Sequence, residues 1–330
     1  MLKSKSILVL GSNSFAGSYF VKKLIDLNHS VIGVSRRNEI DKKFLIYKNI
    51  NYKKKFKFKR IDVNKNLNSL IDLIKKEKPS LIFNFMAQGM VEQSWKSPED
   101  WYNTNLVSQS ILINKIFKFN FIKKFIHFST PEVYGSTAHW ISENFNFMPT
   151  TPYAISRASF DMHLKKMHEN FNFPVIITRT ANIYGPGQQL FRIIPRAILF
   201  AINKKKLIID GDGQTLRSFI HMDDVSNALW QIAKKGKLGE TYHISTKRLI
   251  TIKSLVKKIA KVTNTKLNIS FGPERIGKDK FYKLNTSKIR NLGWRENISL
   301  KNGIEDTFEW IKNFNKNIIN KNLTYYKHQK

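Results

Sequence analysis

The sequence predicts an α/β protein, with a Rossmann-type doubly wound parallel sheet and a smaller α+β lobe. Three observations support this fold class. Short apolar runs alternate with longer amphipathic stretches through the first half of the 330-residue chain, which is the pattern of strand–helix–strand units. A glycine-containing turn follows the first apolar run directly. After about Tyr184, Gly and Pro cluster between shorter helical segments, which favours a second lobe at the carboxyl ends of the strands.

Each element follows from the local pattern. Apolar runs predict six parallel strands, at residues 7–11, 30–35, 58–63, 81–86, 125–129 and 175–179. Amphipathic segments predict helices between them, at residues 15–27, 67–76, 98–117 and 153–170. Right-handed crossovers would place these helices on both faces of the sheet. Shorter helices are expected in the smaller lobe, at residues 192–202, 222–235 and 252–262.

Composition excludes several classes of protein. The chain has no cysteine, which excludes disulfides and thiolate metal sites. No apolar run approaches the roughly 18 residues of a membrane span, and the run after Met1 is interpreted as a buried strand rather than a signal peptide. We therefore expect a soluble, cytoplasmic protein with no membrane partner.

The net charge of +33 has two interpretations. It could indicate a polyanionic partner such as nucleic acid, or a compositional bias toward lysine. Because the lysines are spread along the whole chain and no nucleic-acid-binding motif accompanies them, we favour the bias. We expect no nucleic-acid partner, although the charge would help to attract an anionic substrate.

The segment GSNSFAG at residues 11–17 joins the first predicted strand to the first helix. Gly11 lets the chain turn tightly, and Gly17 lets the helix pack closely on the strand. The helix N-terminus at Phe15 then offers N–H groups to a pyrophosphate. Ser14 replaces the middle glycine of a GxxGxxG pattern, so the segment would also fit an ordinary strand–helix turn. Its place at the start of an alternating α/β chain favours dinucleotide binding.

The end of the second strand bears on the choice between NAD and NADP. A carboxylate there binds the ribose 2′-hydroxyl of NAD, whereas arginine accommodates the 2′-phosphate of NADP. Here the strand ends without an acid, and Arg36 and Arg37 follow. The sequence therefore predicts NADP, with NAD as the alternative, unless the two arginines only reflect a basic composition.

Three further motifs are FSTPEVYG at residues 128–135, YAISR at 153–157 and RTANIYGP at 179–186. With shorter segments at residues 62–63, 217–224, 275–279 and 292–294, they resemble the extended short-chain dehydrogenase/reductase family, in particular its nucleotide-sugar 4,6-dehydratases in the NAD-dependent epimerase/dehydratase group. The resemblance covers nearly the whole chain. It implies that residues 1–184 form mainly an NAD(P)-binding Rossmann domain and residues 185–330 mainly a nucleotide-sugar-binding lobe.

The resemblance assigns the base to Tyr153. A tyrosine with its ordinary pKa of about 10 is a poor base at neutral pH, but a cation one helical turn away stabilises the phenolate. The family uses lysine at that position, and this chain has Arg157. Arginine keeps the charge and can still contact the nicotinamide ribose, although its planar group is bulkier.

The motif at residues 128–135 supplies two more catalytic candidates. Thr130 resembles the family residue that hydrogen-bonds the sugar 4-hydroxyl. Glu132 occupies the position from which dehydratases remove the C5 proton, an acid that the family's epimerases generally lack. Pro131 stands where thymidine-type dehydratases have an aspartate that acts as the acid for water loss, and proline cannot donate a proton.

Other candidates also follow from the resemblance. On the cofactor side, these are Asp62 and Val63 after the third strand, and Ala87 and Gln88 after the fourth. On the substrate side, Asn182 is expected to contact the substrate, and Arg217 and Arg275 to clamp its two phosphates. His127 and His221 are interpreted as packing or hydrogen-bonding residues, and no metal site is expected.

Together these features imply a nucleotide-sugar 4,6-dehydratase, a lyase that converts an NDP-hexose into an NDP-4-keto-6-deoxyhexose by internal hydride transfer through bound NADP. A GDP-sugar type is favoured by the absence of aspartate at Pro131, by the arginines after the second strand and by the Ala-Gln pair. The alternatives are an epimerase or 4-reductase of the same family, and a non-catalytic dinucleotide or nucleic-acid binder. The family pairs through helices that correspond to residues 98–117 and 153–170, which implies a homodimer or homotetramer.

Overall fold

The computed structural model describes residues 6–274, 276–277, 279, 281–312 and 314. Its centre is a seven-stranded sheet in which every neighbouring pair is parallel, in the order β12-β7-β5-β4-β1-β2-β3. The strands are β1 (Ile7–Leu10), β2 (Val31–Ser35), β3 (Phe56–Arg60), β4 (Leu81–Asn84), β5 (Lys124–Ser129), β7 (Val175–Thr180) and β12 (Thr241–Ile244). The predicted doubly wound α/β sheet is confirmed.

Helices cover both faces of this sheet because its strands are apolar on both sides. Along β1, Ile7 and Val9 belong to the core beneath α1 (Phe15–Asp26) and α7 (Met222–Lys235). Leu8 and Leu10 belong to the core on the opposite face. The helices of that second face are α2 (Leu67–Glu77), α4 (Ser108–Ile116) and α5 (Pro152–Phe171).

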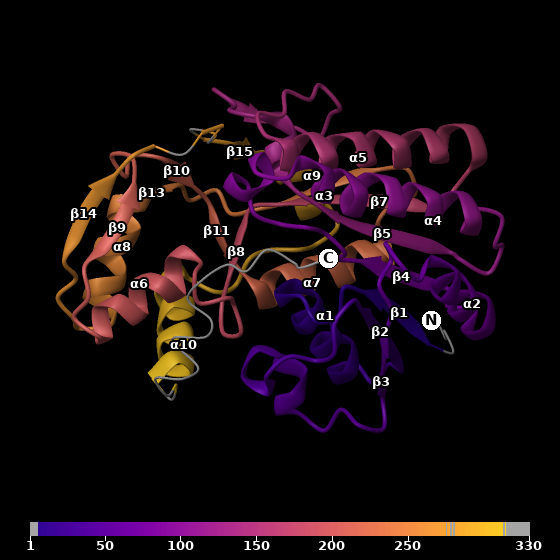
Figure 1. The fold of residues 1–330 in the computed structure, drawn as a ribbon, viewed down its shortest axis with the longest axis horizontal. Helices are drawn as coiled ribbons and strands as arrows, with labels where there is room; N and C mark the ends of the chain where they lie inside the picture. Colours follow the sequence, from indigo (N-terminus) through magenta and orange to yellow (C-terminus); the bar gives the residue numbers. More distant parts are fainter. Residues whose placement is uncertain (1–5, 275, 278, 280, 313, 315–330) are drawn as a thin grey trace.

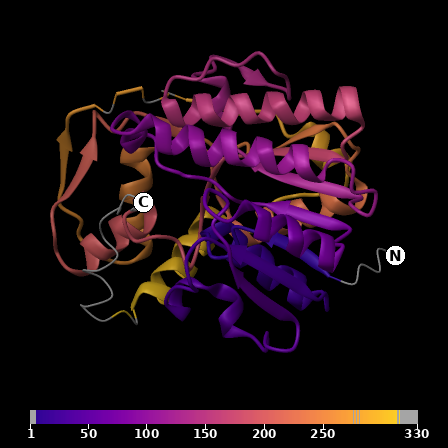
Figure 2. The same ribbon diagram turned by 45° about the vertical axis from the view of Figure 1, so that its right-hand side comes forward.

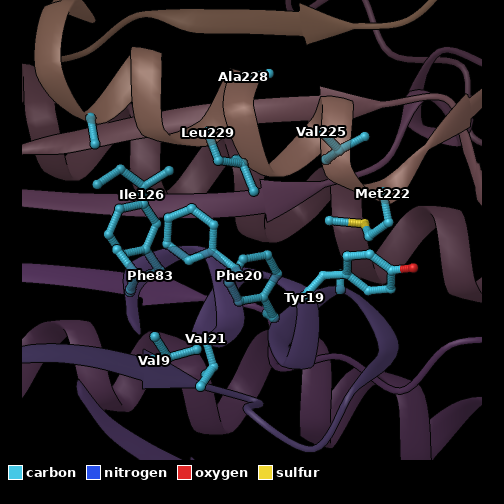
Figure 3. Packing of buried hydrophobic residues seen from close by; sticks show 14 of the residues in the cluster. Val9, Tyr19, Phe20, Val21, Phe83, Ile126, Met222, Val225, Ala228 and Leu229 are labelled. Carbon is cyan, nitrogen blue, oxygen red and sulfur yellow. The ribbon is translucent and has the colours of Figure 1, made fainter. Parts of the chain in front are cut away.

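Figure 3 shows the first of these cores from close by. Phe20 of α1 packs against Phe83 of β4 with ring centroids 4.2 Å apart, and Val225 and Leu229 of α7 approach from the other side. All four side chains are almost completely buried. Helix α7 was expected in the smaller lobe, but the structure places it on the main sheet, where its apolar stripe covers α1.

Two further predictions were wrong in detail. The third strand begins earlier than predicted, at Phe56, and ends at Arg60. This lysine-rich strand lies at the sheet edge and only Phe56 is buried, so its apolar pattern does not mark its ends. The helix expected over residues 98–117 is divided into α3 (Pro98–Tyr102), a π-helical turn (Asn103–Val107) and α4. The seventh strand, β12, was not predicted at all.

The smaller lobe lies beside the sheet (Figure 1) and is built on short strand pairs and three helices. Its helices α6 (Ile193–Ile202), α8 (Ile252–Val262) and α10 (Leu300–Lys312) enclose a separate apolar core. The paired strands are β8 (Asn182–Tyr184) with β11 (Phe219–His221), β10 (Leu216–Arg217) with β13 (Ile250–Thr251), and β9 (Leu207–Asp210) with β14 (Ile269–Gly272). A last pair, β6 (Trp140–Ile141) with β15 (Lys283–Leu284), lies above the sheet.

None of the helices within the described part of the chain is both long and apolar enough to cross a lipid bilayer.

Candidate active site

A cavity of about 1070 Å³ lies between the carboxyl ends of the sheet strands and the smaller lobe. Segments that follow β1, β2, β3, β4, β5 and β7 all reach it, as expected for a doubly wound sheet. Most residues singled out in the sequence line this one cavity: Gly11, Ser14, Phe15, Arg36, Arg37, Asp62, Val63, Ala87, Gln88, Thr130, Glu132, Tyr153, Arg157, Asn182 and Arg217.

Two of the sequence candidates are not among these lining residues. Gly17 is buried beneath the turn and does not line the cavity. A Cβ at Gly17 would lie 2.2 Å from the carbonyl oxygen of Gly11, so its role is the close packing of α1 on β1. Arg275 lies outside the described residues.

The turn between β1 and α1 has the geometry of a phosphate-binding segment. Gly11 has φ +81°, and a Cβ there would lie 2.8 Å from the backbone of Phe85, so only glycine fits. Ser14 is the N-cap of α1, and its Oγ accepts a hydrogen bond of 3.0 Å from the N–H of Gly17. Phe15 and Ala16, in the first turn of the helix, line the cavity. The positive end of the helix dipole therefore faces the space that a pyrophosphate would fill.

The end of β2 carries no acid directed at this space. The Oγ of Ser35 accepts a hydrogen bond of 2.9 Å from the N–H of Asn13. The next carboxylate along the chain, Glu39, accepts a hydrogen bond from the Tyr47 hydroxyl and lies 3.3 Å from the ammonium of Lys48. Among the described residues that line this end of the cavity, Arg36 and Arg37 therefore supply the charge after the strand.

Thr130, Glu132 and Tyr153 line the cavity close to one another. Thr130 caps a 3₁₀ turn (Pro131–Tyr134), with its Oγ1 3.3 Å from the N–H of Glu132, and it also hydrogen-bonds the Tyr153 hydroxyl. Burial raises the pKa of Tyr153 above its usual range, and the nearby carboxylate of Glu132 adds to this. The positive charge of Arg157 opposes both and favours the phenolate.

Arg157 is buried under Tyr153, one helical turn along α5. Its guanidinium donates hydrogen bonds to the carbonyl of Phe128 and, at 3.5 Å, to that of Met86. Its Nη2 also lies 3.2 Å from Nε2 of His127. Burial, reinforced by the charges of Arg157 and Arg179, lowers the pKa of His127 well below its usual range, so this ring is neutral. Arg157 therefore connects the ends of β4 and β5 through hydrogen bonds, in addition to opposing the rise in the pKa of Tyr153.

Several buried polar atoms around the cavity have no hydrogen-bond partner within the described part of the chain. They include Nε of Arg157, Oγ of Ser129 and Oγ1 of Thr180. Buried polar groups in proteins are normally paired, so a polar ligand is expected to complete them. With the glycine turn and the arginines after β2, these atoms fit a nicotinamide dinucleotide.

The far side of the cavity presents groups suited to a sugar diphosphate. Asn182 on β8 accepts a hydrogen bond from the hydroxyl of Tyr282. Arg217 on β10 donates to the carbonyl of Asp279 at 2.6 Å, and its guanidinium carbon lies 4.9 Å from the centre of the Tyr282 ring. This packing fixes the guanidinium at the cavity wall, where a bidentate contact with phosphate is possible.

Sequence analysis did not identify Asn105, which lies in the π-helical turn. Its side-chain amide accepts from the N–H of Gln88 at 2.7 Å and donates to the Gln88 carbonyl at 3.0 Å and to Ser156 at 2.9 Å. It thereby fixes the backbone after β4 to α5. A π-helical turn is common at functional sites, and the available signal was a polar side chain on the buried face of a predicted helix.

Tyr282 was also not singled out, because nothing in its local pattern distinguishes it from a core aromatic. Within the described residues, no group of three or more His, Asp or Glu side chains is placed to hold a metal ion. His127 and His221 are buried and hydrogen-bonded, in agreement with the sequence interpretation.

Comparison with known proteins agrees with this geometry. Residues 8–307 match the family model described as GDP-mannose 4,6 dehydratase. The human dTDP-D-glucose 4,6-dehydratase is 30% identical over 94% of this chain and 90% of its own length. A trifunctional UDP-glucose 4,6-dehydratase/UDP-4-keto-6-deoxy-D-glucose 3,5-epimerase/UDP-4-keto-L-rhamnose-reductase from Arabidopsis thaliana is also 30% identical, over 93% of this chain, but the chain spans only 47% of that protein.

Solved structures give the same result. The dTDP-glucose 4,6-dehydratase of Streptomyces venezuelae, solved with NAD bound, has a TM-score of 0.86 and 26% identity, covering 93% of this chain and 97% of that one. The UDP-glucuronic acid 4-epimerase of Bacillus cereus, in complex with UDP-glucuronic acid and NAD, has a TM-score of 0.85 and 26% identity over 93% and 99%. The chain therefore belongs to the GDP-mannose 4,6-dehydratase family, an enzyme family among the extended short-chain dehydrogenases/reductases.

Proposed function

We propose that this protein is a nucleotide-sugar 4,6-dehydratase that converts an NDP-hexose into an NDP-4-keto-6-deoxyhexose, with a GDP-sugar as the substrate class to test first. The observation that carries the proposal is Glu132, whose carboxylate lines the cavity beside Tyr153 and Thr130. A dehydratase needs a second base near the sugar ring, in addition to the base that acts at the 4-hydroxyl. We assign this role to Glu132.

The residues divide the reaction between them. Tyr153 takes the proton of the 4-hydroxyl, and Thr130 orients the two oxygens. The bound nicotinamide supplies the hydride acceptor and donor. The resulting 4-ketone acidifies the C5 proton, which Glu132 removes. The 6-hydroxyl then leaves as water, taking its proton from the carboxylic acid of Glu132 or from a water molecule, because Pro131 has no proton to give. Return of the hydride to C6 and addition of a proton from solvent to C5 would complete the 4-keto-6-deoxyhexose.

The epimerase alternative is supported by the structural likeness to the UDP-glucuronic acid 4-epimerase. The two functions differ in the mass of the product. Incubation with GDP-, dTDP-, UDP- and CDP-hexoses, followed by mass spectrometry, should reveal the loss of one water molecule from one of them. A product of unchanged mass with inverted stereochemistry would instead identify an epimerase, and net consumption of NADPH a 4-reductase.

We propose NADP as the cofactor, and expect it to bind more tightly than NAD. The reason is that Arg36 and Arg37 line the cavity wall, whereas the carboxylate of Glu39 is already paired with Tyr47 and Lys48. A charge-assisted contact with the 2′-phosphate is worth roughly tenfold or more in affinity. Calorimetric titration of cofactor-free protein should show this difference, and Arg36→Ala with Arg37→Ala should remove it while NAD binding is retained. Equal affinities in the parent protein would refute the assignment.

We further propose that the protein forms a homodimer, or a homotetramer built from that dimer, through α4 and α5, which lie side by side in Figure 1 and in Figure 2. Ile111 on α4 and Met162 on α5 are 43% and 53% exposed, and Val107 and Ile155, earlier along the same two helical segments, are also exposed. A two-fold axis would cover this patch with its own copy. Ile111→Asp with Met162→Asp should give monomers in light scattering. Leu238→Asp, at an exposed apolar site elsewhere, should leave the assembly intact, and an unchanged mass in the double variant would refute this interface.

A further inference from the structure

We propose that the edge of the central sheet opposite the cavity is a docking surface for an anionic lipid bilayer. The seven strands are all parallel, so the segments that lead into them lie together at one end of the sheet and the cavity lies at the other. We call this end the amino edge, and it faces away from the smaller lobe (Figure 1). The segments that lead into β2, β3, β4, β5, β7 and β12 are residues 27–30, 51–55, 75–80, 117–123, 171–174 and 235–240.

Lysine dominates the amino edge. The same six segments contain two acids, Glu77 and Glu240, and the carboxylate of Glu240 is paired with Lys288. Positive charge therefore exceeds negative charge on this surface, and such a surface attracts anionic headgroups. The exposed lysines of the six segments are Lys53, Lys54, Lys75, Lys76, Lys78, Lys118, Lys123, Lys235 and Lys237.

A uniform bias toward lysine does not account for this surface. The segments that follow the same strands, at the opposite end of the sheet, mix the two signs of charge. Arg36 and Asp41 follow β2, and Asp62 and Lys65 follow β3. The excess of positive charge is therefore concentrated at the amino edge, although the whole chain is basic.

The helix dipoles explain only part of the excess. Helices end at the amino edge, and a cation in the last turn stabilises the negative end of a helix. Lys75 and Lys76 have this position on α2. Lys118, Lys123 and Lys237 lie outside the helices, so the stability of a helix does not require them.

Apolar side chains are exposed between the lysines. Leu27, Phe171 and Leu238 lead into β2, β7 and β12, and they are 37%, 56% and 42% exposed. The ring of Phe171 lies 5.3 Å from that of Phe117, over which the ammonium of Lys118 lies at 5.5 Å. A lipid surface accommodates both kinds of group, since Phe and Leu enter the headgroup boundary while lysines contact the anionic headgroups. A nucleic acid would use the lysines and leave the leucines exposed to water, so the mixture favours a bilayer.

A contact of this kind is peripheral. The expectation of no membrane partner rested on the lack of a membrane-spanning segment, and a peripheral contact needs none. Docking through the amino edge would leave the cavity, at the opposite end of the sheet, open to dissolved ligands. The inference therefore does not depend on the proposed function.

Sedimentation with vesicles tests the inference on the full chain. The protein should bind vesicles of equal parts phosphatidylglycerol and phosphatidylcholine, should not bind pure phosphatidylcholine, and should be released in part by salt. A lysine near an anionic surface contributes about fivefold to affinity. A variant with four substitutions should therefore bind the anionic vesicles about tenfold or more weakly. These substitutions are Lys54→Gln, Lys118→Gln, Lys123→Gln and Lys237→Gln.

A matched variant removes the same charge from the smaller lobe. It should bind the vesicles as the parent does, and both variants should keep the parental melting temperature and dinucleotide affinity. Equal loss of binding in the two variants would show that net charge alone acts, and would overturn the proposal. The matched substitutions, all at exposed lysines, are Lys205→Gln, Lys206→Gln, Lys257→Gln and Lys258→Gln.

The apolar side chains distinguish a bilayer from a nucleic acid. Phe171→Ser with Leu238→Ser should weaken binding to the anionic vesicles severalfold, while weak retention by duplex DNA stays unchanged. Leu238→Ser alone, in a surface turn, gives the same test with a smaller effect if the double variant has a lowered melting temperature. No binding to the anionic vesicles, or tighter binding to duplex DNA than to them, would refute the membrane surface and leave the nucleotide-sugar proposal untouched.

Discussion

Replacing Glu132 by glutamine should stop the reaction after the first hydride transfer. The amide keeps the size of the side chain but cannot remove the C5 proton, and a general base typically contributes about 10²–10⁴ in rate. Oxidation at C4 requires Tyr153 and Thr130, which the substitution leaves in place. Reduced nicotinamide should therefore accumulate on the enzyme, visible in its absorbance band after substrate is added, without formation of the dehydrated product.

Isotope labelling sharpens this test. If Glu132 passes the C5 proton to the leaving hydroxyl, or exchanges it with solvent, C5 must be reprotonated from solvent, and the parent enzyme in heavy water should give a product with deuterium at C5. The hydride at C6 should come from C4 of the same molecule. Glu309→Gln removes an exposed carboxylate on α10, which pairs with Lys312 at the surface, and should behave as the parent. Unchanged turnover in the Glu132 variant would remove the dehydratase assignment and leave the epimerase or reductase in its place.

Replacing Arg157 by methionine should raise the pKa of Tyr153 further. Burial already raises this pKa, and the charge of Arg157 is the largest opposing influence. Because the base must be deprotonated to act, losing that charge should move the rising limb of the kcat–pH profile to more alkaline pH. A nearby opposite charge typically shifts a pKa by about 1–3 units, so activity at neutral pH should fall about 10- to 1,000-fold and recover partly as pH is raised.

Arg157→Lys is the matched control. An ammonium keeps the charge and can still reach the carbonyls of Met86 and Phe128, so much of the activity and the position of the pH profile should be retained. Thermal unfolding of both variants separates a packing defect from an electrostatic one, since Arg157 is also buried and hydrogen-bonded at the carboxyl ends of β4 and β5. A methionine variant that is slow but has an unmoved pH profile would show that the arginine does not tune the tyrosine.

The sequence predicted the central sheet well because its strands carry local signals. Strand β1 is a continuous apolar run, and β4 and β7 each begin with three apolar residues. The glycine turn after β1 is required by steric contacts at Gly11 and Gly17. Short or edge strands lack such signals. The four residues of β12 include Thr241 and His243, and they become a strand only through pairing with β7. Their assignment depends on tertiary contacts rather than on local pattern.

The residues of the site divide in the same way, into those with a local sequence signal and those recognised only from tertiary contacts. Residues in motifs after the strands were found, because parallel strands bring their carboxyl ends to one edge. Tyr282 and Asn105 were missed, since each acts through partners far away in the chain, at Asn182 and Gln88. The buried partners of Arg157 were also invisible in the sequence. Only the fold reveals that this arginine faces two carbonyls and a neutral histidine rather than solvent.

The pairing of β12 with β7 has a consequence for how the protein can be synthesised and folded. The sheet acquires its last strand only when residue 244 is available, and α7, which seals the core over α1, ends nine residues earlier, at Lys235. A nascent chain that has grown only to Tyr184 therefore exposes the edge of β7 and the apolar face of α1. Unpaired edges and uncovered cores are where partly folded proteins associate. We therefore expect that residues up to Tyr184 do not mature ahead of the rest, and that the central sheet folds with the later residues as one cooperative unit.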